Sequence, residues 1–256
     1  MNTSSTARIF PIYDPKNPPE HPGEEWTRFV CISDTHSHTH YNVPPGDVLL
    51  HAGDLSSWGS YPQLAKTVNW LRTLPHPVKV VVAGNHDLCL DEEVELYKSS
   101  VVTAAKDMMR NEAALQAGIH YLEYDSAEVT VQNGRTWHFY GSPAAPKYAS
   151  GSFQYRDIKQ GDKIYNRIPS STEILLTHTP PYGIHDLCKK GTHVGCRSLA
   201  SHLQSDQLAN CRLHVFGHIH EAFGVSIDTL PGGLERVSVN AAIRRSDFPI
   251  IVDLRN

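Results

Sequence analysis

The sequence predicts an α/β fold with a parallel sheet, and three observations support this prediction. Short apolar segments typical of buried strands occur at residues 28–33, 47–52 and 78–83. A helical spacing of apolar residues lies between the second and the third of these strands. Each strand also ends abruptly in a polar cluster, and open α/β sheets place their chemistry at the carboxyl ends of strands. The 256 residues are enough for one large α/β domain.

The N-terminal residues 1–27 are expected to form an extended arm on the surface, ahead of one domain over residues 28–256. The arm is rich in Pro, Asn and Ser, and its apolar side chains Ile9, Phe10, Ile12 and Tyr13 could pin it to the domain. It shows neither the charged-then-apolar pattern nor the small-residue cleavage site of a secretory signal. Beyond it we find no internal repeat and no further domain boundary.

The strand at 78–83 is followed by the most informative turn in the chain. Gly84 allows the backbone to turn sharply and leaves space beside it. Asn85, His86 and Asp87 are thereby delivered to the carboxyl end of the strand. The helix that precedes the strand is expected at residues 61–74, where apolar residues recur at helical spacing and prolines follow.

The second half of the chain predicts further strands and helices with less regular spacing. An Asn-Gly turn predicts a hairpin, and a stretch rich in Gly, Pro and Ser predicts a long loop. The expected elements are helical segments at 91–117 and 193–208, hairpin strands at 127–131 and 136–141, a loop at 141–169, strands at 173–177 and 212–216, and three antiparallel strands at 224–230, 235–242 and 249–254.

Composition excludes several classes of protein. A net charge of −4 gives no basic surface for tight binding to a nucleic-acid polymer. No apolar run approaches the roughly 20 residues that a membrane span needs. The five cysteines are odd in number and scattered, which is typical of reduced thiols in an intracellular protein. We therefore expect a cytoplasmic protein without a membrane segment.

Histidine is unusually frequent, with sixteen residues against three methionines. Several histidines stand with acids or an amide directly after five separate strands. Taken singly, each could be a helix cap, a surface residue or a buried core histidine, but five such coincidences are hard to attribute to chance. The candidate ligands are Asp34, His36, Asp54, Asn85, His86, His178, His218 and His220.

Imidazoles and carboxylates without thiolates suit divalent metals such as Mn, Fe or Zn. The set contains more ligands than one ion needs, and a carboxylate such as Asp54 has two oxygens with which to bridge a pair of ions. Two neighbouring metals form the arrangement used for in-line displacement at phosphorus. The sequence therefore predicts a two-metal site for phosphoester chemistry.

The ordered motifs D-x-H, G-D, G-N-H-D, H and G-H-x-H, spread over about residues 28–256, resemble those of the calcineurin-like metallophosphoesterase superfamily. The segments RFVCISDTHS, GDVLLHAGD, VVAGNHD, THTPP, VGC and LHVFGHIHEAFG are similar to those of the small stand-alone metallophosphoesterase-domain-containing family. The resemblance implies a four-layer α/β/β/α sandwich of two mixed β-sheets. It also implies two divalent metal ions, with Mn favoured over Fe or Zn.

The resemblance also implies a role for each residue of the motifs. The first ion would be held by Asp34, His36, Asp54 and His220, and the second by Asp54, Asn85, His178 and His218. Catalysis would use His86, which donates to the phosphate together with Asn85 and protonates the leaving oxygen, and Asp87, which tunes His86 or a ligand.

Three residues have two open interpretations, and a fourth has one. His38 could reach a substrate phosphate or be an exposed loop residue, and Phe153 could stack on a nucleobase or anchor its loop to the body of the domain. His51 is expected to pack beside the ligands. Asn240 could approach the site or shape a turn.

The sequence thus predicts a metal-dependent phosphoric ester hydrolase, in which a hydroxide activated by two metals attacks a small substrate such as a nucleotide. A phosphodiesterase is favoured, with phosphomonoesterase activity as an addition. The segment G-D-L-S-S-W lacks the arginine that protein phosphatases carry there. A nucleotide-binding regulatory protein of low turnover is the alternative, and a DNA exonuclease would need a DNA-binding surface that the sequence lacks. The sequence leaves the oligomeric state and the physiological substrate open.

Overall fold

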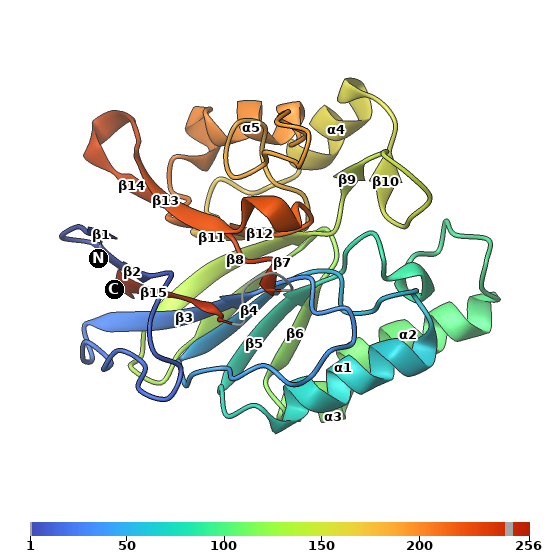
Figure 1. The fold of residues 1–256 in the computed structure, drawn as a ribbon, viewed down its shortest axis with the longest axis horizontal. Coiled ribbons are helices and arrows are strands. Elements are labelled where there is room, and N and C mark those ends of the chain that lie inside the picture. Colours follow the sequence, from blue (N-terminus) through green and yellow to red (C-terminus); the bar gives the residue numbers. More distant parts are fainter. Residues whose placement is uncertain (1, 244–247) are drawn as a thin grey trace.

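The computed structural model of the chain describes residues 2–243 and 248–256. Two β-sheets pack face to face, and helices cover the outer face of each, which gives the layer order α/β/β/α (Figure 1). This architecture confirms the four-layer sandwich of two mixed sheets that the sequence motifs imply. Among the described residues, no helix combines the length and the apolar character needed to cross a membrane.

The first sheet has seven strands, and its middle strands β3, β4, β5 and β6 run parallel to one another. Strand β15 pairs antiparallel with β3 on one side and with β2 on the other. In spatial order the strands are β1 (Asn2–Thr3), β2 (Ala7–Phe10), β15 (Ile250–Arg255), β3 (Trp26–Ile32), β4 (Val48–Ala52), β5 (Val78–Val82) and β6 (Ile119–Leu122).

The second sheet has six strands, of which β14, β12, β11 and β8 are parallel and the two outer strands are antiparallel. Its strands in spatial order are β13 (Gly224–Thr229), β14 (Glu235–Asn240), β12 (Leu213–Phe216), β11 (Ile174–Thr177), β8 (Thr136–Ser142) and β7 (Asp125–Thr130). Strands β9 (Ala145–Pro146) and β10 (Gln154–Tyr155) form a separate parallel pair.

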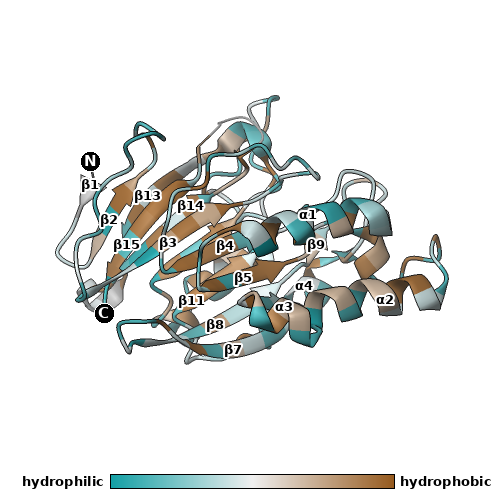
Figure 2. Ribbon diagram, turned by 90° about the horizontal axis from the view of Figure 1, so that it is seen from below, coloured by the Kyte–Doolittle hydropathy of each residue, from teal (hydrophilic) through white to brown (hydrophobic). Residues whose placement is uncertain are grey.

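Alternation along the strands divides the apolar side chains between two layers, because successive residues of a strand point to opposite faces. On β3, Phe29 and Cys31 face the second sheet and belong to the central core. Val30 and Ile32 face the helices instead and belong to an outer core. Figure 2 shows the resulting apolar strands between helices of mixed hydropathy.

Three helices cover the first sheet and two cover the second. The buried stripe of α1 is formed by Leu64, Val68 and Leu71, at the helical spacing seen in the sequence. The helices are α1 (Tyr61–Thr73), α2 (Ser99–Arg110), α3 (Glu112–Gln116), α4 (Ile158–Tyr165) and α5 (Arg197–Leu203), with 3-10 turns at η1 (Leu88–Leu90), η2 (Asp206–Leu208), η3 (His220–Ala222) and η4 (Pro231–Gly233).

The structure corrects the expectation of an N-terminal surface arm. Residues Ala7–Phe10 form strand β2, which pairs with β15, and three of its four side chains are buried. The apolar side chains of ARIF fit a strand that packs into the sheet, and the partner strand β15 lies more than two hundred residues away in the sequence. The local pattern therefore held no sign of the pairing.

Three further expectations need correction. The stretch 141–169 is not one long loop, because Asp157 caps a helix there by accepting a hydrogen bond from the Gln160 backbone. The last three strands are not one antiparallel set. Strand β14 runs parallel to β12, and β15 joins the first sheet. The predicted helix at 193–208 is shorter, since α5 spans Arg197–Leu203.

Candidate metal centre

The five polar clusters of the sequence meet at one edge of the sandwich. Strands β3, β4 and β5 of the first sheet and β11 and β12 of the second contribute the loops that follow their carboxyl ends. Because parallel strands of one sheet end at the same edge, and because the two sheets face each other, these loops come together. The convergence of residues from Asp34 to His220 was the central expectation from the sequence.

One part of the cluster is formed by Asp34, His36 and His220. Each offers one ligand atom, and these atoms lie within 4.8 Å of one another. The Nε2 atom of His220 is 3.0 Å from Oδ1 of Asp34 and 3.4 Å from Nε2 of His36. This is a compact set of one carboxylate and two imidazoles.

A second part is formed by Asn85 and His178. The Nδ1 atom of His178 donates to the Ala52 carbonyl at 3.0 Å, since a carbonyl only accepts. In the neutral ring, Nε2 therefore carries a lone pair, and it lies 2.9 Å from Oδ1 of Asn85. Two acceptors that face each other at this distance fit a cation between them.

Asp54 lies between the two parts and turns one oxygen to each. Its Oδ2 atom is 3.7 Å from Nε2 of His36, and its Oδ1 atom is 3.4 Å from Nε2 of His178. The Oδ1 atom also accepts a hydrogen bond of 2.8 Å from the His86 backbone. The Asp54 carboxylate is thus placed where it could bridge two metal ions, one in each part of the cluster.

The side chain of His218 lies beside this second part, with its ring centroid 5.0 Å from that of His178. Its backbone N–H donates to both carboxylate oxygens of Asp34, at 3.0 and 3.1 Å. Burial, reinforced by His178, lowers the pKa of His218 to about 3. The imidazole is therefore neutral at pH 7 and can act as a metal ligand.

The backbone of the site is strained where the candidate ligands stand. Asp34, His36, Asp54 and His218 all have positive φ angles, of 56°, 47°, 53° and 66°. Such conformations are uncommon for residues other than glycine and persist where the surroundings impose them, often at functional sites. The fold holds these four side chains in directions that relaxed loops would not supply.

Two glycines make the close packing of the loops possible. A Cβ atom on Gly84 would lie 2.4 Å from the backbone nitrogen of Asp54. A Cβ atom on Gly217 would lie 2.0 Å from Oδ2 of Asp34. Any larger residue would push the carboxylates out of place, so the G-N-H and G-H-x-H motifs need glycine for steric reasons.

The two buried carboxylates have opposite electrostatic surroundings. Burial raises the pKa of Asp54, and the nearby charges of Asp34 and Asp87 raise it further. Burial acts in the same direction on Asp34, but the hydrogen bond from His220 and the charges of His178 and His36 outweigh it and lower the pKa. Two carboxylates this close need positive charge to remain ionised together.

The donor set fits divalent ions. Two carboxylates, one amide oxygen and neutral imidazoles match the ligands of Mn, Fe or Zn, and no thiolate takes part in any candidate group among the described residues. The raised pKa of Asp54 and the facing acceptors of His178 and Asn85 both favour added positive charge. Divalent cations would supply it.

The ring of His86 is oriented by a backbone carbonyl and not by Asp87. Its Nδ1 atom donates to the Ser57 carbonyl at 2.7 Å, and its ring makes an edge contact of 4.8 Å with that of His36. Nε2 is thus the nitrogen free for chemistry. The carboxylate of Asp87 is buried and accepts hydrogen bonds from Gly84 and Ser56 instead of orienting the imidazole.

Asp87 therefore does not tune His86, but its charge raises the pKa of the candidate ligand Asp54, in line with the alternative that it acts on a ligand. The Asp87 carboxylate joins the loop after β5 to the loop after β4, through four hydrogen bonds with Gly84, Leu55 and Ser56. Asp87 is fully buried and cannot touch a substrate. A carboxylate that follows a histidine in sequence need not face its ring, because neighbouring side chains of a turn diverge.

Phe153 is not placed for stacking on a substrate. It is only 7% exposed and packs in the core under the helices of the first sheet, with its backbone N–H bonded to Asp91 at 2.6 Å. The anchoring interpretation is the correct one. His38 is exposed and its ring lies 5.6 Å from that of His40, so a contact with substrate stays a prediction.

Several residues support the loops of the site through hydrogen bonds to backbone carbonyls or to other side chains. The hydroxyl of Ser152 donates to the carbonyls of Gly84 and Asn85. His51 is buried and bonds to Thr35 at 2.9 Å, in agreement with the expected packing role. The amide of Asn240 donates to the Ile219 carbonyl between the last two histidines.

Fold and cluster together define a metal-dependent phosphoesterase, and the comparisons with known proteins agree. The family model described as Calcineurin-like phosphoesterase matches residues 27–222. The chain belongs to this family. Membership implies divalent metal cofactors and hydrolysis of phosphoesters.

Similar proteins extend over nearly the whole chain. Metallophosphoesterase domain-containing protein 1 of Homo sapiens, and the protein of the same name in Mus musculus, are each 38% identical over 94% of this chain and 74% of their own length. A UPF0046 protein of Caenorhabditis elegans is 32% identical over 90% of this chain and 82% of its own.

Proposed function

We propose that this phosphoesterase is a phosphodiesterase for small, nucleotide-like esters that works with two divalent ions. Asp34, His36, Asp54 and His220 would hold one ion, and Asp54, Asn85, His178 and His218 the other. The observation that carries the proposal is the position of Asp54, whose two oxygens face the two sets of ligands separately.

The bound ions would supply Lewis-acid stabilisation of the phosphate and hydroxide at neutral pH. The protein contributes a proton at His86. Because Nδ1 of this ring is fixed by the Ser57 carbonyl, Nε2 is the nitrogen that can give a proton to the leaving oxygen. Asn85 and His86 are both partly exposed, so a phosphate that enters the site can reach them.

A diester is favoured because, among the described residues, the side chains of the site offer little fixed positive charge of their own. The groups that act most strongly on Asp34, Asp54 and His218 are histidines and aspartates, without any Lys or Arg. A diester carries one negative charge and needs less neutralisation than a monoester dianion. The name of the human relative, which speaks of a metallophosphoesterase domain, is compatible with either substrate.

Hydrolysis of bis(p-nitrophenyl) phosphate in the presence of Mn²⁺ tests this proposal. We expect turnover that EDTA abolishes and Mn²⁺ restores, and a loss of more than about 100-fold for Asp54→Asn, since even residues behind the ligands are worth 10–100-fold. Asp162→Ala, an exposed aspartate on α4, is the matched control. Tight AMP binding without turnover would point to a regulatory nucleotide-binding protein instead.

A further inference from the structure

Trp58 is the unusual aromatic residue of this chain. Its side chain is 75% exposed, whereas Trp26 is 8% exposed and Trp137 is fully buried. Tryptophan is rarely left in water, because its ring buries a large apolar area. An exposed Trp next to the candidate site is therefore a candidate for contact with a ligand.

The other three tryptophans have ring partners. Arg8 lies 4.6 Å above Trp26, Arg135 lies 4.3 Å above Trp137, and Trp70 is 6.2 Å from the Tyr41 ring. Over residues 2–243 and 248–256, no ring or cation contact of this kind involves Trp58. Its indole face is open to a partner from outside the chain.

The backbone on the N-terminal side of Trp58 is joined to the catalytic histidines. The carbonyl of Ser57 accepts the hydrogen bond from Nδ1 of His86 at 2.7 Å. The hydroxyl of Ser57 donates to the backbone carbonyl of His36 at 2.5 Å. Trp58 is thus one peptide unit from the residue that orients the candidate proton donor.

The backbone on the other side is equally fixed. Gly59 has a φ angle of 71°, and a Cβ atom there would lie 2.5 Å from Cβ of Leu88. The carbonyl of Gly59 accepts from the Cys89 backbone, and the N–H of Trp58 donates to Gln63 at 2.8 Å. The indole projects from a rigid loop, which keeps the entropy cost of binding against it low.

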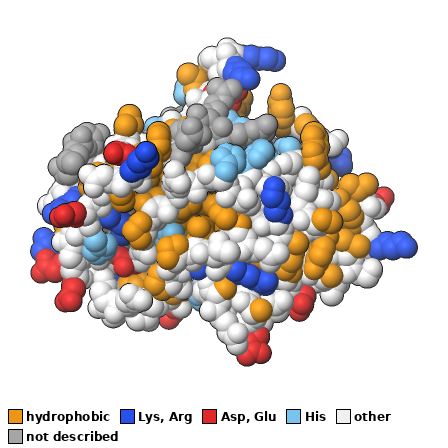
Figure 3. Space-filling model, turned by 60° about the horizontal axis from the view of Figure 1, so that its bottom comes forward, with side chains coloured by type: hydrophobic (Ala, Val, Ile, Leu, Met, Phe, Trp, Pro, Cys, Tyr) orange, Lys and Arg blue, Asp and Glu red, His pale blue; other side chains and the backbone are white. Residues whose placement is uncertain are grey.

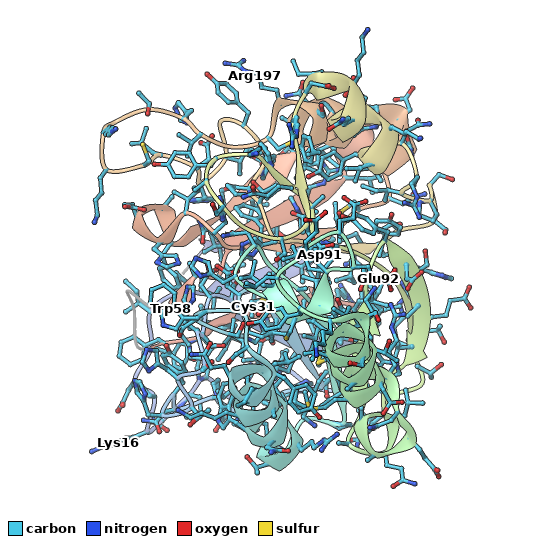
Figure 4. All side chains as sticks on the ribbon, turned by 90° about the vertical axis from the view of Figure 1, so that its right-hand side faces the viewer. Lys16, Cys31, Trp58, Asp91, Glu92 and Arg197 are labelled. Atoms are coloured by element: carbon cyan, nitrogen blue, oxygen red, sulfur yellow. The ribbon has the colours of Figure 1, made fainter. Side chains whose placement is uncertain are left out.

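We propose that Trp58 is the stacking platform for the planar group of the substrate, on the side of the ester bond that His86 protonates. This inference rests on the proposed function and names its substrate class as phosphate esters of nucleosides or other planar alcohols. Figure 4 shows Trp58 at the outer edge of the molecule, near the level where the two sheet layers meet. The position suits a group that extends out of the site while its phosphate stays inside.

Two ligands that differ only in the base test the inference. AMP and ribose 5-phosphate have the same sugar and phosphate, and only AMP offers a ring to stack. We expect Trp58→Ala to weaken AMP binding about 5- to 100-fold, in line with base stacking on aromatic side chains. Binding of ribose 5-phosphate is expected to stay within 2-fold of wild type. Both affinities are measured by calorimetry on Mn²⁺-loaded protein.

A fluorescence titration supplies a second readout. AMP is expected to quench the tryptophan emission of the wild type, and this quenching is expected to disappear in Trp58→Phe while affinity is largely kept. Leu115→Ala, an exposed apolar side chain on α3, is the matched control and leaves both affinities unchanged.

The outcomes separate this inference from the proposed function. A wild type that hydrolyses the diester but binds AMP no better than ribose 5-phosphate overturns the stacking role alone. An equal loss for both ligands in Trp58→Ala overturns it too, because a general distortion of the site would then explain the effect. Absence of diester turnover in the metal-loaded wild type contradicts the proposed phosphodiesterase, whatever Trp58 does.

Discussion

Charge is arranged in opposite ways at the two ends of the sheets. Near the amino end of β3, the guanidinium of Arg28 meets the carboxylate of Asp253 at 2.7 and 2.8 Å, and its remaining N–H groups donate to the carbonyls of Pro19 and Glu20. Arg135 nearby pairs with Glu173. Acids and bases at this end neutralise each other within the protein.

At the carboxyl end of the same strands, Asp34 and Asp54 face imidazoles and, among the residues that the structure describes, no guanidinium. Two carboxylates this close favour a bound cation. Residues other than glycine with positive φ angles gather at this end, at Asp34, His36, Asp54 and His218, whereas the charged side chains of the amino end are paired. The comparison indicates that one end stabilises the fold and the other is organised for a cation. Figure 3 shows several histidine side chains next to one another on the surface of this face of the molecule.

The largest expected effect on activity is that of His86→Gln. If Nε2 of His86 supplies the proton to the leaving group, kcat should fall by about 100- to 10,000-fold. Metal content, measured by atomic absorption, should stay at the wild-type value. His138→Gln, at a half-exposed histidine paired with Glu128, serves as control. A kcat within a few-fold of wild type would remove His86 from the chemistry.

The next largest effect is expected at the opposite end. Arg28→Met leaves Asp253 buried without its partner, so the free energy of unfolding should fall by about 3–5 kcal/mol. The exposed pair of Arg255 and Glu25 provides the control, since Arg255→Met should cost about 0–1 kcal/mol. Urea denaturation measures both. Loss of Mn²⁺ binding in folded Arg28→Met would contradict the division between the two ends.

Metal binding should stabilise the wild type, and this stabilisation should depend on the ligands at the carboxyl ends of the strands. At 100 times its dissociation constant, Mn²⁺ should raise the free energy of unfolding by about 2.7 kcal/mol. The same addition should do little for Asp54→Asn, because both sets of ligands use this residue. Thermal unfolding with and without EDTA makes the measurement. Equal stabilisation of the two proteins would show that the ions bind elsewhere.

The smallest effect concerns a buried histidine away from the site. Burial lowers the pKa of His76 to about 4, below the 6.5 expected when unfolded. The unfolded chain thus binds the proton first, and stability is lost as the pH falls from 6.5 towards 4. Between pH 7 and pH 5 this histidine should cost roughly 2 kcal/mol. In His76→Gln, the free energy of unfolding from urea denaturation in EDTA should fall by that much less between pH 7 and pH 5. An unchanged slope would contradict the shift.

Much of the fold near the site could be predicted from the sequence. The strands before Asp34, Asp54 and Asn85 are apolar runs with clear ends, and their order required a parallel sheet. Pairings between distant segments could not be predicted. Strand β15 pairs with β2 and β3 across more than two hundred residues, and local periodicity does not specify a partner.

The candidate site shows the same limit. Residue types identified His178 and His220, since imidazoles after strand ends are rare enough to notice. Contacts made through the backbone left no such signal, so the carbonyl of Ser57 and its bond to His86 were not foreseen. The sequence G-D-L-S-S-W did give one indication of an unusual residue near the site, because Trp58 is a large aromatic residue in a mostly polar loop.

Anomalous diffraction from crystals grown with Mn²⁺ would locate the bound ions. We expect two manganese peaks that flank Asp54, one beside Oδ2 and His36 and the other beside Oδ1 and His178. A single peak, or manganese bound away from Asp54, would contradict this expectation.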